Sequence, residues 1–371
     1  MTAEVKQPTP RRRTRRILFR LFVLLVSSAI ALVLIEVGLS IFAPQRMGQP
    51  GLEPLGGILV PRPDLRGRDF APGDFDVQVS TNSQRFRGQR EYEMAPKAGT
   101  TRVLVLGDSF VYGVGAGDSE TYPHQLEQLL NEGQTTFEVI NAGIYGSGTG
   151  EQVVWYEQWP IRFEPALVVL TVYENDFQDD RRRPAFVLKG EELAPRTRAD
   201  LQESSKDQAS LRSITRRLPG YTYLSQHSHL LNLLRRAATV GLRPPEASQP
   251  ALAVEPAAEG PKRNLLHHLE LKRLEGVVSG HGGRLVVVYI PSRAAIWETS
   301  PPPESNHVIA SLTESCQELG LQFEDLTTVM RREYTAEAPL YFKGDMHCTP
   351  AGYHAVARGV SAFLQREGLG R

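Results

Sequence analysis

One serine of the sequence occupies a position suited to nucleophilic chemistry. Ser109 lies in Gly107-Asp108-Ser109-Phe110, directly after the apolar run Val-Leu-Val-Leu at 103–106. The run is typical of a buried strand, and open α/β sheets place reactive groups where such strands end. A serine hydroxyl is a weak nucleophile at neutral pH, so it needs a base, a group that orients the base, and donors for the oxyanion. A Gly-Asp-Ser turn is often only a turn, so the case depends on these other parts.

The sequence offers a base in the segment Gly-Asp-Met-His-Cys-Thr-Pro at 344–350. We expect a helix to begin at Pro350 with Thr349 as its N-cap, which places His347 in the loop before that helix. A turn into a capped helix can bring the Asp345 carboxylate to the imidazole of His347, whereas an extended strand would hold them apart. The alternative is a turn-closing aspartate and an ordinary loop histidine.

Two further segments supply possible oxyanion donors. The glycine-rich stretch 141–148 follows the second predicted strand, and its glycines let a backbone N–H approach a substrate closely. Asn175 follows the third predicted strand and has an amide that can donate, although it could also serve as a cap or turn residue. No histidine pair has metal-ligand spacing with a third ligand, and His-Glu-x-x-His is absent, so we expect no metal site and no cofactor.

The apolar pattern predicts the elements that must position these residues. Short runs rich in Val, Leu and Ile predict strands at 102–107, 137–141, 166–172, 284–290 and 321–326. Apolar residues at three- and four-residue spacing predict helices at 122–130, 150–163, 265–279, 306–319 and 350–364. Alternating strands and helices predict a three-layer α/β/α sandwich with a parallel flavodoxin-like sheet.

The order of the motifs resembles the SGNH (GDSL-type) hydrolase superfamily, from about residue 102 to the C-terminus. The matching blocks are Gly107-Asp108-Ser109, Gly146, Asn175-Asp176 and Asp345-x-His347. The resemblance implies that Ser109 is the nucleophile, His347 the base and Asp345 its orienting acid. It also implies an oxyanion hole formed by the N–H groups of Ser109 and Gly146 and by the Asn175 amide.

Two details depart from the common pattern of that superfamily. The acid and base are often spaced Asp-x-x-His, whereas the shorter spacing here resembles polysaccharide O-acetyltransferase relatives. Tyr173-Glu174 precede Asn175, where a glycine is common. A different serine-hydrolase fold, the α/β-hydrolase, is disfavoured because the pentapeptide Gly-x-Ser-x-Gly is absent.

The N-terminus predicts a membrane anchor. The apolar stretch 21–43 is interrupted only by Glu36 and follows a basic tail at 1–20, which contains Arg11, Arg12, Arg13, Arg15, Arg16 and Arg20. The positive-inside rule places this tail in the cytoplasm and the rest of the chain outside it. A cleaved signal peptide is the alternative, but the stretch is longer than a signal core and no clean small-x-small site follows it.

The remaining sequence predicts the domain organisation of the chain. We predict a stalk and extension at 44–100, with a strand at 76–80, and a hydrolase-like domain at 101–371 with an insertion at 181–261. Within the insertion, a helix at 223–238 could be part of a lid or a passive surface element, and 243–261 is expected to be disordered. Whether Cys316 and Cys348 pair, and the oligomeric state, stay open.

The combined hypothesis is a serine esterase that cleaves an acyl ester, with acetyl as one option, outside the cytoplasm. The substrate could be a small molecule, a lipid or a glycan. Nucleic acid is not an expected partner, because 42 basic and 42 acidic residues leave no net charge. The alternatives are a polysaccharide O-acyltransferase of the cell envelope and a non-catalytic envelope binding module.

Overall fold

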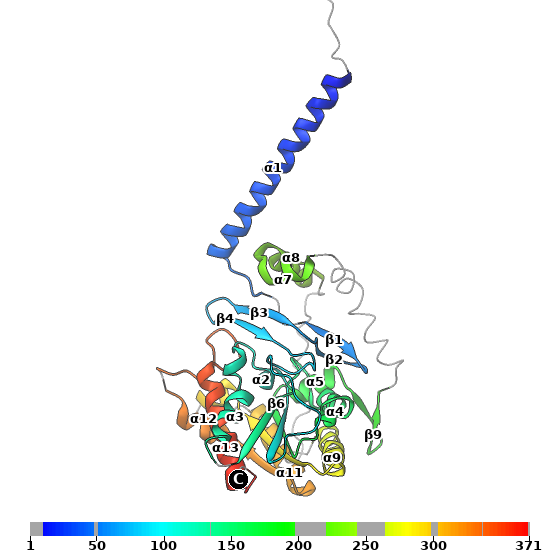
Figure 1. Cartoon of the computed structure of the whole chain (residues 1–371), viewed down its shortest axis with the longest axis vertical. Helices are drawn as coiled ribbons and strands as arrows, with labels where there is room; N and C mark the ends of the chain where they lie inside the picture. The colour runs from blue at the N-terminus through cyan, green and yellow to red at the C-terminus, as the bar shows by residue number, and fades with distance from the viewer. Residues whose placement is uncertain are drawn as a thin grey trace, which may run out of the picture.

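A five-stranded parallel sheet lies at the centre of the computed structural model, which describes residues 10–47, 51–133, 135–196, 220–242, 264–297, 303–335 and 337–369. Its strands are β5 (Thr100–Leu106), β6 (Thr136–Asn141), β7 (Leu167–Tyr173), β10 (Arg284–Ile290) and β11 (Gln322–Asp325). Their order across the sheet is β11-β10-β7-β5-β6 (Figure 1). Counted from β6, the second strand in the chain precedes the first, third, fourth and fifth, so the predicted flavodoxin-like order is confirmed.

Helices cover both faces of the sheet, as predicted. Val103 and Val105 of β5 point into the core beneath α3 (Tyr122–Leu130), α12 (Thr327–Glu333) and α13 (Pro350–Arg366). Leu104 and Leu106 point to the other face, beneath α4 (Thr149–Gln158), α9 (Leu265–Gly280) and α11 (Pro303–Leu319). Cys316 and Cys348 belong to these opposite cores, and both are free thiols.

Two predicted helices are divided in the structure. The helix predicted at 150–163 ends at Gln158, and a separate 3₁₀ turn, η2 (Pro160–Phe163), follows, because proline lacks the N–H that would continue the α-helix. The helix predicted at 223–238 consists of α7 (Tyr221–His227) and α8 (His229–Leu242), with extended backbone at Ser228 between them. The segment 243–261, expected to be disordered, lies outside the described residues.

Several short elements were not predicted. They are the hairpins β1 (Leu52–Leu55) with β2 (Ile58–Pro61) and β8 (Phe186–Lys189) with β9 (Glu192–Pro195), the strand β3 (Arg66–Ala71), which pairs with β4 (Phe75–Ser80), and the helices α2 (Ser109–Tyr112), η1 (Asp118–Glu120), α5 (Asp176–Arg182), α10 (Arg293–Trp297) and α12. The strand predicted at 76–80 corresponds to β4.

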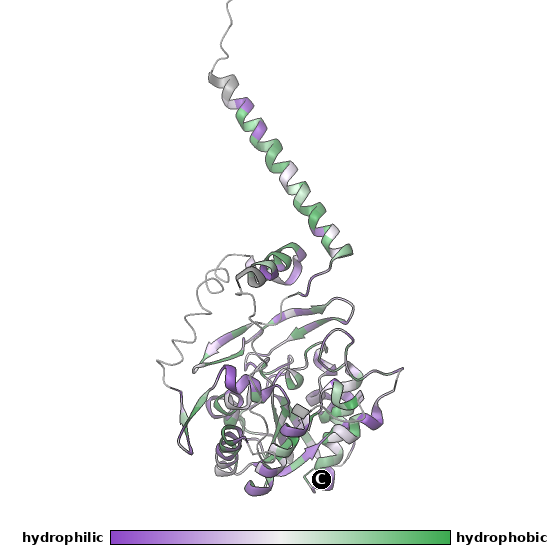
Figure 2. Ribbon diagram, turned by 180° about the vertical axis from the view of Figure 1, so that it is seen from behind, coloured by the Kyte–Doolittle hydropathy of each residue, from purple (hydrophilic) through white to green (hydrophobic). Residues whose placement is uncertain are grey.

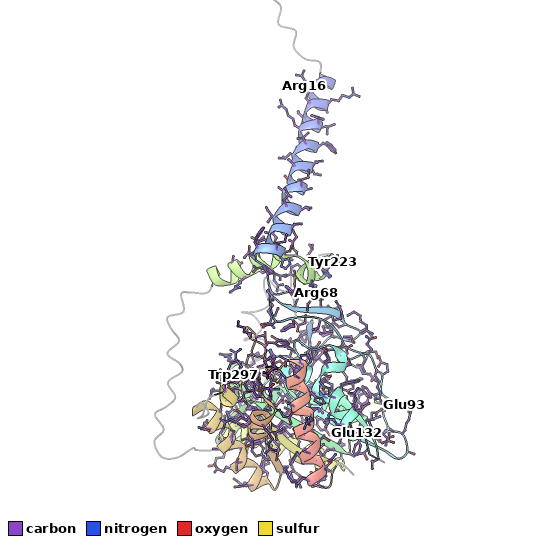
Figure 3. The ribbon with its side chains drawn as sticks, turned by 90° about the vertical axis from the view of Figure 1, so that its left-hand side faces the viewer. Arg16, Arg68, Glu93, Glu132, Tyr223 and Trp297 are labelled. Carbon is purple, nitrogen blue, oxygen red and sulfur yellow. The ribbon has the colours of Figure 1, made fainter. Side chains whose placement is uncertain are left out.

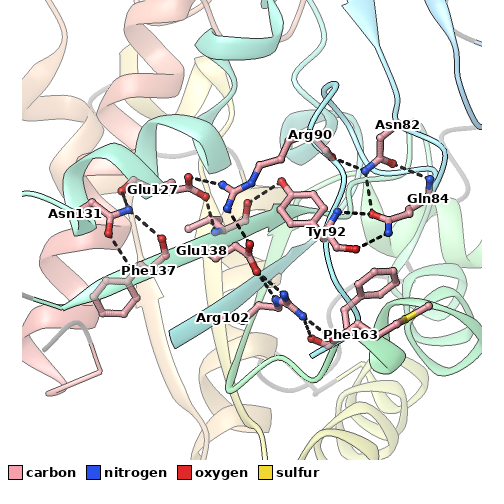
Figure 4. Close-up of polar contacts among 12 residues, drawn as sticks. Asn82, Gln84, Arg90, Tyr92, Arg102, Glu127, Asn131, Phe137, Glu138 and Phe163 are labelled. Carbon is pink, nitrogen blue, oxygen red and sulfur yellow. Dashed lines mark hydrogen bonds and ion pairs between the residues drawn. The ribbon is translucent and has the colours of Figure 1, made fainter. Parts of the chain in front are cut away.

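The segment 82–92 runs across the sheet edge formed by β6 (Figure 4). Arg90 binds the carboxylates of Glu127 and Glu138, each at 2.8 Å. Glu138 of β6 also binds Arg102 of β5, at 2.5 Å. Phe86 is fully buried in the same core as Leu104. This part of the extension is therefore packed on the sheet.

One long helix projects from the domain. Helix α1 (Pro10–Phe42) contains a stretch, Thr14–Phe42, that is long and apolar enough to cross a membrane (Figure 2). None of the residues of this stretch is fully buried in the protein. The foot of α1 contacts α8, which lies between α1 and the β3-β4 hairpin (Figure 1).

Candidate active site

Ser109 stands where β5 passes into α2. Asp108 caps this short helix, because its carboxylate accepts the Phe110 N–H at 2.8 Å. Gly107 permits the sharp turn, since a Cβ there would lie only 2.7 Å from the Thr171 carbonyl oxygen of β7. The nucleophile candidate thus sits at the carboxyl edge of the sheet with 6% of its surface exposed.

The structure brings His347 and Asp345 to this serine. The His347 Nε2 lies 2.8 Å from the Ser109 Oγ, and the Nδ1 lies 2.5 Å from the Asp345 Oδ1. The same carboxylate oxygen accepts the His347 backbone N–H at 3.0 Å. This bond from a residue two positions later makes an Asx turn, which folds the carboxylate back over the ring. The turn explains how an acid and a base separated by one residue can meet.

The loop that carries His347 is fixed on both sides. The Phe342 N–H donates to the His347 carbonyl and the Thr349 N–H to the Leu340 carbonyl, both at 3.0 Å. The Thr349 hydroxyl then caps α13 by accepting the Gly352 N–H at 3.1 Å. On its other side the imidazole packs against the ring of Phe110, with centroids 4.9 Å apart. The ring therefore has little freedom to leave Ser109.

Two of the three predicted oxyanion donors, Gly146 and Asn175, follow the strands that flank β5. Gly146 is the third residue of a turn closed by a 3.2 Å bond from the Ser147 N–H to the Ile144 carbonyl, and its φ of 64° is a left-handed value that favours glycine. Asn175 precedes α5, and its amide donates to the Asp179 carboxylate at 2.9 Å. An asparagine amide carries two N–H groups, so one remains for a ligand.

The comparison with protein families decides the class of the chain. The model of the GDSL-like lipase/acylhydrolase family matches residues 105–355, more than half of the chain. The chain belongs to this family. The superfamily resemblance and the expectation of an ester-hydrolysing enzyme are therefore confirmed. A comparison with curated proteins gives no match.

Solved structures of low sequence identity are similar to the chain. A structure titled "Crystal Structure of TesA" is 12% identical, with coverage of 72% of this chain and 99% of that chain and a TM-score of 0.42. A psychrotrophic esterase, EstA from Pseudoalteromonas sp., is 11% identical, with coverage of 72% and 98% and a TM-score of 0.40. An acetylxylan esterase from Geobacillus stearothermophilus is 14% identical, with coverage of 72% and 96% and a TM-score of 0.39.

Arg46 is a member of the site that sequence reasoning missed. Its guanidinium lies 2.6 Å from the Asp345 Oδ2, the oxygen that His347 leaves free. Burial by itself raises the pKa of the Asp345 carboxyl, but the bonds from His347 and the charge of Arg46 hold that pKa well below its ordinary value. These partners of Asp345 in this GDSL-family enzyme favour the ionised form of its carboxyl. No local motif could signal Arg46, which stands 299 positions before Asp345.

A second group of carboxyls lies behind the site, between α4, α5 and α9. Asp180 accepts the Gly150 N–H at 2.9 Å, and burial raises the pKa of Asp180 to about 7. Burial and the neighbouring Asp180 raise the pKa of Glu270 well above its ordinary value. A protonated Glu270 can donate to Asp180, and such a shared proton allows two buried acids to lie side by side. Among the residues that the structure describes, no group of acids, histidines and cysteines could hold a metal ion.

Proposed function

We propose that this GDSL-family enzyme is a membrane-anchored serine esterase, with Ser109 as nucleophile, His347 as general base and Asp345 as the acid that orients the base. The observation that carries the proposal is the continuous chain of two short contacts, 2.8 Å from Ser109 to His347 and 2.5 Å from His347 to Asp345. Nucleophile, base and orienting group within hydrogen-bond reach are the signature of an activated serine.

The reaction follows from this geometry. The Ser109 Oγ attacks the ester carbonyl carbon while its proton passes to the His347 Nε2, and the carbonyl oxygen becomes an oxyanion. The bond to the alcohol then breaks, and His347 protonates the departing alcohol. Water attacks the acyl-enzyme, gives a proton to His347, and releases the acid as that proton returns to Ser109. The anionic Asp345 stabilises the imidazolium in both halves.

The oxyanion is stabilised in this proposal by the N–H groups of Ser109 and Gly146 and by the free amide hydrogen of Asn175. The bond from Asn175 to Asp179 fixes the direction of the amide before substrate arrives. Donors held in place in this way need no reorganisation during the reaction, which is the source of their catalytic effect.

Contacts just after α1 support an uncleaved anchor. Arg46 binds Asp345, the Gln45 N–H donates to the His229 ring at 2.9 Å, and Met47 pairs with Phe70 of β3. The chain leaving the apolar helix is thus part of the folded enzyme. The arginines at the N-terminal end of α1, before its apolar stretch, favour a cytoplasmic N-terminus and an extracytoplasmic catalytic domain.

The nucleophile is tested with the full chain purified in detergent. Ser109→Ala should abolish hydrolysis of p-nitrophenyl acetate and labelling by a fluorophosphonate probe, because only an activated serine reacts with that probe. Ser119→Ala is the matched control, since Ser119 is exposed on η1 and should behave as wild type. Equal labelling of wild type and Ser109→Ala would refute the assignment of Ser109, whereas no labelling and no hydrolysis in wild type would favour a non-catalytic binding module.

A transferase is the second candidate, favoured by the one-residue spacing between Asp345 and His347. It differs only in the second half of the reaction, where an acceptor alcohol replaces water at the acyl-enzyme. Product analysis with an acetyl ester donor and an added acceptor sugar separates the two. Acetate as the main product supports the esterase, and an acetylated sugar supports a polysaccharide O-acyltransferase. The same assay on isolated envelope glycans shows whether acetyl is the acyl group.

A further inference from the structure

Helix α8 is bonded to the apolar helix α1 at its own N-terminus. The Glu36 carboxylate of α1 accepts bonds from the Ser228 hydroxyl at 2.9 Å, from the Leu230 N–H at 3.1 Å, and from the His229 N–H. Unpaired N–H groups and the positive end of the helix dipole make such a terminus a good partner for an anion. The α7–α8 pair is therefore held at the foot of α1, where α8 runs across its end (Figure 3).

The bonds to Glu36 determine how far along the apolar stretch of α1 the N-terminus of α8 lies. Glu36 stands six residues before Phe42, the last residue of α1, which at 1.5 Å per residue is about 9 Å along the helix. An interfacial helix buries its apolar face about 5–10 Å into the boundary between headgroups and acyl chains. A carboxylate at this level is costly unless it has partners, and α8 supplies them.

The face of α8 that points away from the catalytic domain is apolar. Asn232 faces the domain, because its amide lies 3.6 Å from the Met47 sulfur. Residues two positions away in a helix point to the opposite side, which places Leu230 and Leu234 away from the domain. Leu234 is 57% exposed, and on α7 Tyr223 and Leu224 are also largely exposed. Large exposed apolar side chains that cluster beside a candidate membrane span indicate a surface that is buried against a partner or a membrane.

We propose that the α7–α8 pair is a docking surface for the lipid bilayer that α1 crosses. In this proposal, which rests on the anchor described under the proposed function, Leu224, Leu230 and Leu234 enter the interfacial layer. Tyr223 lies at headgroup level, where tyrosine is enriched.

Docking of α7–α8 keeps the active site near the membrane. Arg46 is four residues beyond the end of α1, and its side chain reaches Asp345. Four residues span at most about 14 Å, so the site lies within that distance plus one arginine side chain of the foot of α1. Esters at the membrane surface are thus the substrates that the active site can reach while α7–α8 stays docked on the bilayer. Among the small-molecule, glycan and lipid options, this favours esters linked to a lipid.

Spin labels on the full chain test the docking surface. The protein is placed in vesicles of phosphatidylcholine and phosphatidylglycerol, and a nitroxide is attached at Leu234→Cys, at Leu25→Cys in α1, or at Glu132→Cys on the far side of the domain (Figure 3). Both native cysteines are buried and stay unlabelled. Oxygen concentrates in the bilayer and a charged nickel chelate in water, so the ratio of their collision rates with the label reports depth.

The proposal expects an oxygen-to-nickel ratio at Leu234 several-fold above that at Glu132 and below that at Leu25. If the oxygen-to-nickel ratio at Leu234 equals that at Glu132 while the ratio at Leu25 is still high, the docking surface is overturned and the membrane anchor is retained. If Leu25 also matches Glu132, α1 does not span the bilayer, and the anchor fails together with the docking surface. The esterase assignment depends on neither result, because Ser109→Ala tests it separately.

Discussion

Two groups of buried acidic side chains in this enzyme have pKa values that are shifted in opposite directions. Asp345 at the active site is as buried as many core residues, yet its two oxygens bind His347 and Arg46 and its pKa is held low. In the part of the chain that the structure describes, no basic side chain forms an ion pair with Asp180 or Glu270 behind the site, and burial raises the pKa of both. Burial is common to the two groups, so the partners decide whether a carboxyl is an anion at neutral pH.

Glu151 on α4 shows how strong the effect of burial is. Its carboxylate lies 3.0 Å from Arg183, which favours the charged form, but Arg183 is itself partly exposed. Burial outweighs this partner and raises the pKa of Glu151 to about 7. An ion pair and a backbone N–H, from Gly148, are therefore insufficient at Glu151, whereas Asp345 gains the ring N–H of His347 in addition to both. The number of hydrogen-bond and ion-pair partners therefore determines whether burial raises the pKa of a carboxyl in this protein.

Of the variants that test this contrast, Asp345→Asn should have the largest effect. An amide in place of the carboxylate can no longer stabilise the imidazolium, and it favours the wrong tautomer of His347, so kcat for p-nitrophenyl acetate should fall by roughly 10⁴-fold. Asp74→Asn is the matched control, because Asp74 accepts the Gly344 N–H in the same loop without touching His347. Equal losses in the two variants would mean that loop position, and not charge, matters at Asp345.

Asn175→Ala tests the proposed oxyanion donor, whose amide donates to Asp179, the neighbour of Asp180 on α5. Removing an oxyanion donor should lower kcat by about 10²–10³-fold and leave the melting temperature close to that of wild type. Parallel thermal unfolding measurements serve as the control. A variant with full kcat would remove Asn175 from the oxyanion hole.

Asp180→Asn should change stability and its dependence on pH. The pKa of Asp180 is about 7 in the folded enzyme and near 3.9 when unfolded, so its stabilising contribution is complete below about pH 4 and is lost as pH rises through 7. The wild-type melting temperature should therefore fall by several degrees between pH 5 and pH 8, and the variant should show a smaller fall.

The same measurement of melting temperature against pH should give the opposite result for Asp345→Asn. Because the pKa of Asp345 is lowered by folding, its contribution is present above about pH 4 and is lost only as pH falls further. Its replacement should therefore leave the change between pH 5 and pH 8 as steep as in wild type. If both variants flatten the curve equally, the contrast between the two groups is wrong.

Arg46→Ala gives the smallest expected effect. Arg46 is 42% exposed, and water screens an ion pair of this kind, so a contribution of about 0.2–1 kcal/mol corresponds to a loss of roughly 1.5- to 5-fold in kcat/KM. Arg46→Lys should retain most of the activity, and added salt should narrow the difference between wild type and Arg46→Ala. A loss near that of Asp345→Asn would show that Asp345 depends on Arg46 to remain an anion.

The sequence predicts the sheet well because its strands carry strong local signals. Strands β5, β7 and β10 contain continuous apolar runs, and α13 has a cap, a proline and a clear apolar face. These elements agree with the structure within a few residues. The division of the helix predicted at 150–163 was missed because its apolar spacing continues through Trp159 and Pro160. The short hairpins were missed because two strands of four residues bury too little to impose a pattern.

The candidate site was predictable only as far as short motifs reach. Gly107-Asp108-Ser109 and Asp345-x-His347 are local patterns, and the structure brings them together because both lie at one edge of the sheet. Arg46, by contrast, meets Asp345 only through the tertiary path of the chain after α1. The pairing of Asp180 with Glu270 depends on how α5 and α9 pack, which no spacing in the sequence reveals.

The segment 82–92, which lies across β6, has a consequence for the order of synthesis. Arg90 and Phe86 precede β6 by about fifty residues in the chain, so they leave the ribosome before that strand does. When β6 joins the growing sheet, the residues that occupy its outer side are already available. The nascent enzyme therefore need never present this strand uncovered to neighbouring chains, at the stage when unfinished proteins are most prone to aggregate.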